Sequence, residues 1–263
     1  MNTLKDSLIQ HKHVIWALFN REITTKIGDS YFGYALLLLE PLLYVMALAG
    51  LFYLMGRNTG SMPIILFLLT GIIPYLYLRK AIGSCSGAIS ANKTLLSYKQ
   101  VKMIDTLIAR LLLESTISFV ITIVCCLILL YLGEWIPVIQ PLRIIFMTLQ
   151  LIMITVGLGL FVAIIGYYYI DLKTFIGLVF RVLFYTSGIF FGINELPLKI
   201  QYYISFNPLL QIIEIIRSAF NGQSMNIYLS YEYTTFCSII CLFLGLAMYF
   251  IARRNILMNS RAR

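Results

Sequence analysis

Long apolar stretches separated by short polar segments run through most of the chain. Six of these stretches reach the length of about 20 apolar residues that a helix needs to cross a bilayer. They cover residues 34–55, 62–82, 107–132, 142–168, 174–193 and 233–252. The pattern therefore predicts an all-α integral membrane protein with six transmembrane helices. Pro74 lies within the second stretch and is expected to kink or locally break its helix, because proline lacks the N–H that a helix uses.

The segments that flank these stretches divide the chain into three parts. Residues 1–33 predict an amphipathic helix that lies on the cytoplasmic membrane surface, with Trp16 and Phe19 at headgroup depth. An ordinary solvated N-terminal helix is the alternative. We expect residues 34–252 to form a single transmembrane domain and residues 253–263 to form a basic cytoplasmic tail.

The connection between the second and third spans is longer than a turn requires. Residues 83–106 form a polar, basic loop that is predicted to contain short helical stretches. Within this loop the LLSY sequence (residues 95–98) is surrounded by Lys and Asn. An apolar plug with a charged rim is typical of a docking element, and a solvated loop is the alternative.

The connection after the fifth span predicts a helix that is too short to cross. Asn207 can cap this helix with Pro208 at its first position, and Gly222 can end it. About 13 residues cannot span a bilayer, so we expect a re-entrant or surface-lying hairpin on the external side. Glu214 and Arg217 are three residues apart and predict an ion pair.

Lys and Arg are distributed unevenly over the two sides of the membrane. Fourteen lie in the N-terminal segment, in residues 79–106, at Lys173 and in the C-terminal tail, whereas four lie on the other side, at positions 57, 143, 199 and 217. Cytoplasmic flanks retain positive charge, so both termini are predicted to be cytoplasmic. This topology and contact with anionic lipid account for the net charge of +9 without nucleic acid as a partner.

Composition supports the membrane assignment and excludes some functions. Hydrophobic residues make up 60% of the chain and charged residues 12%, about half of the usual charged share. The five cysteines have no metal-type or disulfide-type spacing, so no metal site is predicted. No glycine is followed by lysine, so the chain lacks a phosphate-binding P-loop and cannot itself hydrolyse ATP.

Charged residues within or at the ends of the spans are candidates for function. They are Glu40, Arg110, Glu114, Asp171 and Arg181. A charge at the bilayer centre costs at least about 2.5 kcal/mol, so such residues normally pair or face a wet cavity. Arg110 and Glu114 lie four residues apart and predict a structural ion pair. Arg181 needs a partner such as Glu40 or an anionic substrate group.

The segment GYYYIDLKTFIGLVFR (residues 166–181) is predicted to form the cytoplasmic turn between the fourth and fifth spans. One interpretation is an aromatic belt with a snorkelling Arg181. The other is a polar substrate entrance lined by stacking rings and a cation. The residues of this segment leave both interpretations open.

Four stretches carry a family resemblance. They are REITTKIGDSYFGYALLLLEP before and into the first span, TGIIPYLYLRKAI in the second, AISANKTLLSYKQVKMIDTLIARLLLE through the connection into the third, and NPLLQIIEIIRSAF on the external side. These stretches resemble the permease subunits of ABC-2 type ABC exporters, specifically those that export capsular polysaccharide in Gram-negative bacteria. The resemblance runs along essentially the whole chain.

The resemblance implies a permease that moves a lipid-linked acidic capsular polysaccharide across the bacterial inner membrane. It also implies a homodimer bound to two cytoplasmic ATPase subunits, which would use ATP and Mg²⁺, whereas this chain would bind no cofactor. The other implied partners are membrane lipid and a periplasmic adaptor that leads to an outer-membrane exporter. A permease for O-antigen or a teichoic acid-like glycan is the alternative.

The residues expected to carry these roles form two groups. The coupling helix implied between the second and third spans contains Asn92, Lys93, Leu95, Leu96, Ser97 and Tyr98. The residues expected at the substrate channel or its entrance carry rings or charges, because rings stack on sugar faces and weak contacts let a polymer slide. They are Tyr31, Tyr34, Glu40, Tyr44, Tyr167, Tyr168, Asp171, Arg181, Phe184, Tyr185, Phe190 and Phe191.

Two other classes of membrane protein agree less well with the sequence. A membrane-embedded transferase is disfavoured because the only histidines, His11 and His13, lie near the N-terminus and no nucleophile with a base stands out. An ion-coupled secondary transporter would carry an internal repeat, and no such repeat is visible in the sequence.

Overall fold

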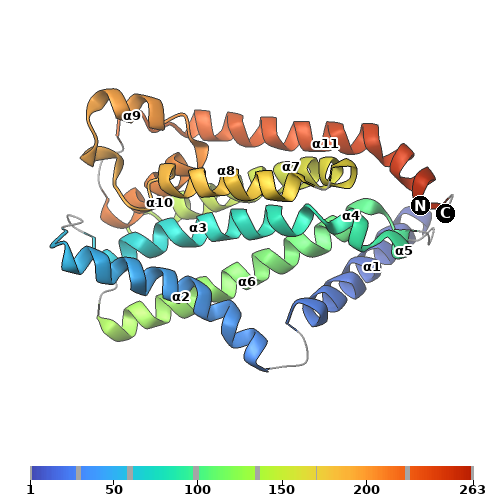
Figure 1. Ribbon diagram of the computed structural model, residues 1–263, viewed down its shortest axis with the longest axis horizontal. Coiled ribbons are helices and arrows are strands. Elements are labelled where there is room, and N and C mark those ends of the chain that lie inside the picture. The colour runs from blue at the N-terminus through green and yellow to red at the C-terminus, as the bar shows by residue number, and fades with distance from the viewer. Residues whose placement is uncertain are drawn as a thin grey trace.

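Helices form every regular element in the residues that the structure, a computed structural model, describes: 2–27, 31–57, 62–96, 101–133, 137–169, 171–222 and 226–261. The long helices α2 (Tyr31–Leu54), α3 (Ile64–Cys85), α6 (Met103–Leu132), α7 (Pro141–Tyr168) and α11 (Tyr231–Arg261) run along the long axis of the molecule (Figure 1). α8 (Leu172–Thr186) packs against α3 and α7. The prediction of an all-α fold is confirmed for these residues.

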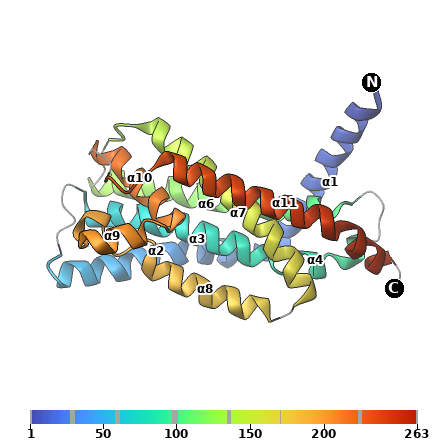
Figure 2. The ribbon, with the colours of Figure 1, turned by 90° about the horizontal axis from the view of Figure 1, so that it is seen from above.

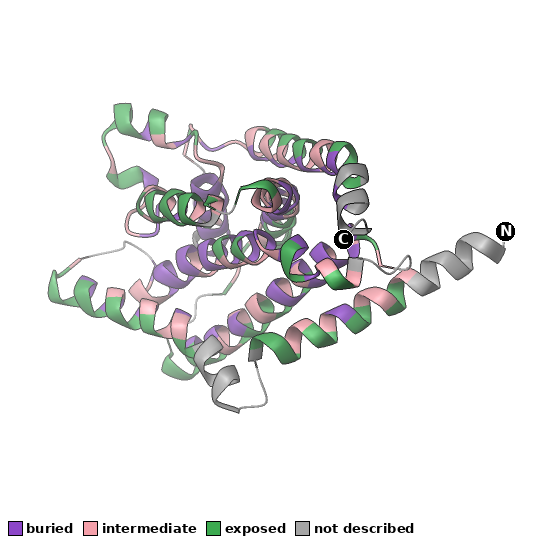
Figure 3. Ribbon diagram, turned by 45° about the vertical axis from the view of Figure 1, so that its right-hand side comes forward, coloured by how far each residue is buried: buried purple, intermediate pink, exposed green. Residues whose placement is uncertain are grey.

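α3 occupies the centre of the bundle because it is apolar around most of its circumference. It packs against α2, α6, α7, α8 and α10 (Pro208–Asn221). In its most apolar stretch 67% of the residues are buried, against 17% in α6 and 22% in α11. The exposed positions of these outer helices lie on the outside of the bundle (Figure 3), where their apolar side chains suit lipid.

Membrane-spanning length differs between the helices. In the described part of the chain, α3, α6, α7 and residues Tyr231–Arg253 of α11 are long and apolar enough to cross a membrane. The apolar stretches Leu39–Leu54 and Thr174–Thr186 are shorter. The helix predicted for residues 174–193 is therefore shorter than expected. It ends early because Gly188 adopts a φ of +72°, a left-handed conformation that leaves the helix.

Proline lies inside two of these helices. Pro41 is in α2 and Pro74 is in α3. α3 nevertheless continues from Ile64 to Cys85, so the local break predicted at Pro74 does not occur. Packing of α3 on all sides compensates for the hydrogen bond that the proline cannot donate.

Two glycines let α7 and α11 approach each other closely. A Cβ atom on Gly157 would lie 2.2 Å from the carbonyl oxygen of Cys241, and one on Gly245 would lie 2.2 Å from the carbonyl oxygen of Gly157. No side chain fits at these distances. The two backbones are therefore in direct contact, as small residues permit between membrane helices.

The short elements lie at the two ends of the bundle. α1 (Asn2–Ile27), α4 (Ala88–Ala91) and α5 (Lys93–Leu96) lie at the end that also holds the C-terminal part of α11. Seen from above, the N-terminal half of α1 projects away from the bundle (Figure 2). η1 (Ile193–Glu195), α9 (Leu198–Ile204) and α10 lie at the opposite end (Figure 1).

The ends of α10 agree with the sequence prediction. The side-chain oxygen of Asn207 accepts a hydrogen bond of 3.0 Å from the backbone N–H of Leu209, and Pro208 is the first helical residue. Gly222, with a φ of 59°, ends the helix. These caps fix a helix of 14 residues between the segment after α8 and the start of α11.

Candidate functional site

The segment that follows α3 turns back onto the end of the bundle as α4 and α5. Asn92 lies between these two short helices and is only 1% exposed. Its side-chain amide donates to the carbonyl of Ala88 at 2.9 Å. Lys93 and Leu95 are partly exposed. Of the other predicted coupling residues, the Leu96 side chain, Ser97 and Tyr98 lie outside the described residues.

Arg21 and Glu22 of α1 join this segment to the bundle. The Arg21 guanidinium donates to Asn92 Oδ1, and it donates to Glu22 at 3.2 Å. Glu22 accepts from Arg110 Nε of α6 at 3.0 Å, and Arg110 Nη1 donates to the carbonyl of Ser84 at 2.6 Å. We call these five residues the Arg21 network. It connects the segment between α4 and α5 with α1, α6 and the end of α3.

A second contact between α1 and α6 lies one turn further along. Lys26 pairs with Glu114, which is 4% exposed. Arg110 and Glu114 were predicted to pair with each other, but each pairs with α1 instead. The reason is that α1 packs along α6 and offers Glu22 and Lys26 at the same spacing of four residues with the charges reversed. The complementary spacing is present in the sequence, but only the packing of α1 on α6 selects these pairs over pairs within each helix.

The start of α6 is also joined to α1. Lys102 Nζ donates to His11 Nε2 at 2.7 Å, which leaves the ring proton on Nδ1, 3.5 Å from Asp105 Oδ2. Asp105 is 2% exposed and accepts from the backbone N–H of Lys102 at 3.0 Å, as in a capping box. Sequence reasoning assigned no role to His11 or Asp105.

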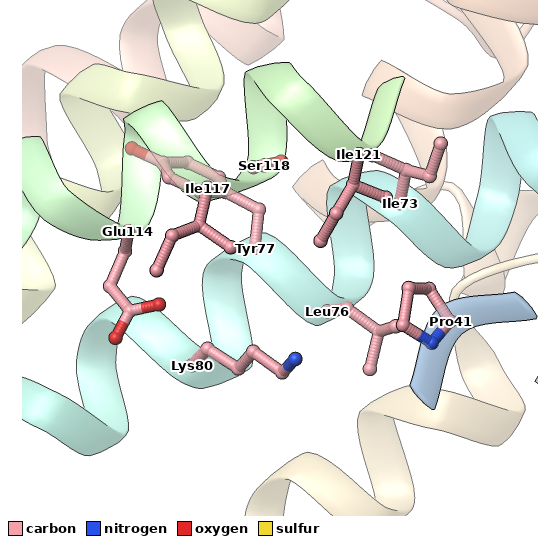
Figure 4. A pocket seen from close by; sticks show the side chains of 9 residues that line it. All are labelled: Pro41, Ile73, Leu76, Tyr77, Lys80, Glu114, Ile117, Ser118 and Ile121. Atoms are coloured by element: carbon pink, nitrogen blue, oxygen red, sulfur yellow. The ribbon is translucent and has the colours of Figure 1, made fainter. Parts of the chain in front are cut away.

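Glu40 of α2 pairs with Lys80 of α3, and the distance from Lys80 Nζ to Glu40 Oε2 is 2.6 Å. Glu40 was suggested by the sequence as a partner for Arg181, but it pairs with Lys80 instead. Lys80 and Glu114 also line a small cavity between α2, α3 and α6, together with Tyr77 and apolar side chains (Figure 4). Its volume of about 20 Å³ is enough for one water molecule.

Part of the predicted channel lining forms one aromatic cluster. The Phe184 ring centroid lies 5.0 Å from those of Tyr75 and Phe190 and 6.1 Å from that of Tyr44. Tyr185 stacks on Phe190 at 5.8 Å. Tyr185 is 61% exposed, so it is the ring of this cluster that is most available to a ligand. The ring of Phe191 is partly buried.

The predicted entrance residues are not gathered into one site. Tyr167 and Tyr168 form an edge-to-face pair at 5.3 Å, and Tyr168 and Asp171 are exposed at the turn before α8. Arg181 is exposed on α8 and has no ion-pair partner among the described residues. The side chains of Tyr31 and Tyr34 lie outside the described part of the structure.

Arg217 joins α10 to α3 and to the segment after α8. It pairs with Glu214 at 2.7 Å, which confirms the predicted ion pair, and its guanidinium lies 3.6 Å from the Phe67 ring centroid. It also donates to the carbonyls of Gly188 at 2.6 Å and of Phe67 at 3.0 Å. Burial lowers the pKa of the Arg217 guanidinium, and the nearby Glu214 carboxylate opposes this shift.

Charged side chains join α1 to α6, α2 to α3, and α10 to α3 and the segment after α8. Across the described residues no group of three or more His, Cys, Asp and Glu could hold a metal ion. Ion pairs between helices hold a defined arrangement, and each becomes costly when one partner is withdrawn.

Comparison with known proteins places these features in context. The ABC-2 type transporter family matches residues 13–221. The chain is 34% identical over 248 residues to the capsule polysaccharide export inner-membrane protein CtrC of Neisseria meningitidis, and the aligned region covers 92% of each chain. It is 32% identical over 239 residues to the polysialic acid transport protein KpsM of Escherichia coli, which covers 90% of this chain and 93% of that one. It is 26% identical over 242 residues to the O-antigen export system permease protein RfbA of Klebsiella pneumoniae, with 88% of both chains covered.

Proposed function

The chain belongs to the ABC-2 type transporter family, and we propose that it is the membrane permease subunit of an ATP-driven exporter that moves a polysaccharide across the bacterial inner membrane. The names of its relatives, which refer to capsule polysaccharide, polysialic acid and O-antigen, support a glycan as cargo. The chain has no P-loop, so ATP and Mg²⁺ are bound by a separate ATPase subunit.

In this proposal the chain crosses the membrane six times, with both termini in the cytoplasm. The helices α3, α6, α7 and α11 have the length and composition for it, and α2 and α8 complete the set. α1 lies at the cytoplasmic surface. α9 and α10 form a periplasmic re-entrant hairpin, because the 14 residues of α10 rise only about 21 Å and a bilayer core is about 30 Å thick.

The Arg21 network is the observation that carries the proposal. The ATPase pair closes when ATP binds, and this closure displaces α4 and α5. The contact of Asn92 with Arg21 passes the displacement to α1, and the pair of Glu22 with Arg110 passes it to α6. A push at one end of the bundle thereby changes which side of the membrane the channel opens to.

The cargo that the chain supports best is a lipid-linked acidic capsular polysaccharide. The capsule relatives are more similar to this chain than the O-antigen relative is. The exposed Tyr185 ring offers a face on which a sugar stacks, and the exposed Arg181 offers a cation to an acidic group. The relative from Klebsiella pneumoniae supports O-antigen, or another glycan such as a teichoic acid, as the second candidate.

The complex contains a second copy of this chain and two ATPase subunits. A homodimer closes the channel along faces that each copy leaves exposed, such as that of α2, where Met46 is 69% exposed. On the periplasmic side an adaptor that leads to an outer-membrane exporter receives the polysaccharide. Membrane lipid surrounds the outer helices.

A co-purification experiment with Leu95→Asp tests the coupling role. Leu95 is partly exposed on α5, so an aspartate there should release the ATPase from the permease while the spans remain inserted. Leu198→Asp is the matched control, because Leu198 is 71% exposed on α9 at the opposite end and the ATPase should stay bound.

Export in cells tests the function itself. The chain with its ATPase should restore surface polysaccharide to a strain that lacks its own permease and ATPase, and the Leu95→Asp variant should not. Undiminished ATPase binding by Leu95→Asp contradicts the coupling role. Failure of the unaltered pair to restore export of any tested glycan contradicts the exporter.

A further inference from the structure

A hollow of about 270 Å³ lies between α3 and α8, away from the Arg21 network. Residues of α3 form one wall, namely Arg79, Gly83 and Ser86. Residues of α8 form the other wall, namely Ile176, Gly177 and Phe180. The sequence interpretation assigned none of these six residues to a site.

Two glycines keep the hollow open. A Cβ atom on Gly83 or on Gly177 would meet no other heavy atom within 4 Å. Arg79 and Gly83 are four residues apart on α3, so they share one face of the helix. Gly177 and Arg181 have the same spacing on α8. Arg79 therefore lines the open space, whereas Arg181 lies one turn along α8 from Gly177 and outside the lining.

Neither of these arginines forms an ion pair within the described residues. Arg79 is exposed and has no ion-pair partner in the described part of the chain, and the same holds for Arg181. The nearby Glu40 is held by Lys80. The Tyr44 and Tyr75 hydroxyls near the Arg79 guanidinium cannot neutralise it, and Glu40 attracts it without forming an ion pair with it.

The position of the hollow indicates the kind of anion. Arg79 lies six residues before the cytoplasmic end of α3, which is a rise of about 9 Å, so the cation lies at the inner side of the membrane. The outer face of α8 beside it is apolar, with Phe175, Leu178 and Val182 exposed. A ligand that satisfies both features has an anionic group next to a hydrocarbon chain, as a lipid phosphate does.

We propose that the hollow between α3 and α8 receives the phosphate of the lipid that carries the cargo, with Arg79 as its cation and the lipid chain along α8. This inference rests on the proposed export function. The Arg79 guanidinium binds the phosphate through charge-assisted hydrogen bonds. The glycines provide the room that the headgroup and the first sugar need, and Tyr185, further along α8, meets the sugar chain that follows.

Substitutions that fill the hollow with a side chain, or that remove the positive charge of Arg79, test the proposal in the permease–ATPase complex. Gly177→Leu places a side chain in open space, and leucine is a better helix former than glycine, so the variant should fold. Arg79→Gln removes one cation, and Arg79→Lys keeps the charge. Gly50→Leu is the matched control, because a Cβ on Gly50 of α2 also meets nothing within 4 Å and Gly50 does not line the hollow.

The first measurement is binding of a defined probe, dioctanoyl phosphatidylglycerol, to the purified complex by native mass spectrometry. We expect Arg79→Gln and Gly177→Leu to weaken binding about tenfold, because a charge-assisted hydrogen bond is lost or blocked. Arg79→Lys should recover most of the affinity, and Gly50→Leu should bind as the unaltered complex does. Equal binding by all variants overturns the site.

The second measurement is export in cells, and it separates this inference from the proposed function. If the unaltered chain restores surface polysaccharide and Gly177→Leu does not, the hollow lies on the route of the cargo lipid. If both restore it equally while Gly177→Leu has lost the probe, the hollow holds a membrane phospholipid and the assignment to the cargo is overturned, although the export function stands. If the unaltered chain restores no surface polysaccharide, the proposed export function is contradicted, and this inference, which rests on it, is contradicted with it.

Discussion

Glu22 of α1 and Arg110 of α6 form an ion pair of 3.0 Å, and the same guanidinium donates to the carbonyl of Ser84 at the end of α3. Glu22 therefore joins the N-terminal helix to α6, and Arg110 joins α6 to α3. The Glu22 and Arg110 side chains are only 12% and 14% exposed. Water screens the pair little, so the loss of one partner leaves a charge without its counter-ion.

Glu22→Gln should lower stability and uncouple ATP hydrolysis from export. We expect a loss of about 3 kcal/mol in the free energy of unfolding, measured by denaturant titration of the purified permease, because Arg110 loses its counter-ion. The double variant Glu22→Arg with Arg110→Glu should recover part of the loss, since it restores opposite charges. A double variant that is less stable than both single variants would show that the pair itself contributes nothing.

Arg217→Lys should destabilise the packing of α10 against α3. Lysine cannot reach Glu214 and the carbonyls of Gly188 and Phe67 together, so we expect a cost of about 3 kcal/mol. Arg143→Lys is the matched control, because Arg143 also contacts α10 but donates a single bond of 3.2 Å to Ser218. That variant should lose about 1 kcal/mol at most. Similar losses for both would contradict the role assigned to Arg217.

Gly157→Val should push α7 and α11 apart. Its Cβ would lie 2.2 Å from a backbone oxygen of α11, and backbone cannot move aside as a flexible side chain does. We expect a loss of about 3 kcal/mol or more, seen as a lower unfolding temperature in detergent. Gly50→Val on the open face of α2 should leave the temperature nearly unchanged. An unshifted temperature for Gly157→Val would refute the close contact of the two backbones.

Cysteine labelling tests the orientation. In a variant without native cysteines, Gln140→Cys, just before α7, should react with an impermeant reagent added to cells with a permeable outer membrane. Lys93→Cys on α5 should react only after lysis, because the distribution of Lys and Arg predicts that this end of the bundle is cytoplasmic. The reverse result for the two positions would invert the topology.

The sequence predicted best those features that depend on neighbouring residues. Asn207, Pro208 and Gly222 fixed the ends of α10, and the spacing of Glu214 and Arg217 predicted their ion pair, because caps and pairs within a helix are local. The spans longer than 20 residues followed in the same way from continuous apolar runs.

Contacts between distant segments were predicted less well. Arg110 and Glu114 could pair within α6, and nothing local indicates that α1 offers each a better partner. The length of α8 was overestimated because hydropathy does not register the left-handed turn at Gly188. The hollow at Arg79 needs α3 and α8 to be adjacent, which the composition of either helix alone does not reveal.

The early end of α8 also bears on the surrounding bilayer. Its 15 residues rise about 22 Å, which is shorter than the hydrocarbon thickness of about 30 Å. Such hydrophobic mismatch is relieved when the bilayer thins beside the short helix. In the proposed topology, where α8 crosses the membrane, a thinned patch beside it would shorten the distance that a polar headgroup travels between the two leaflets.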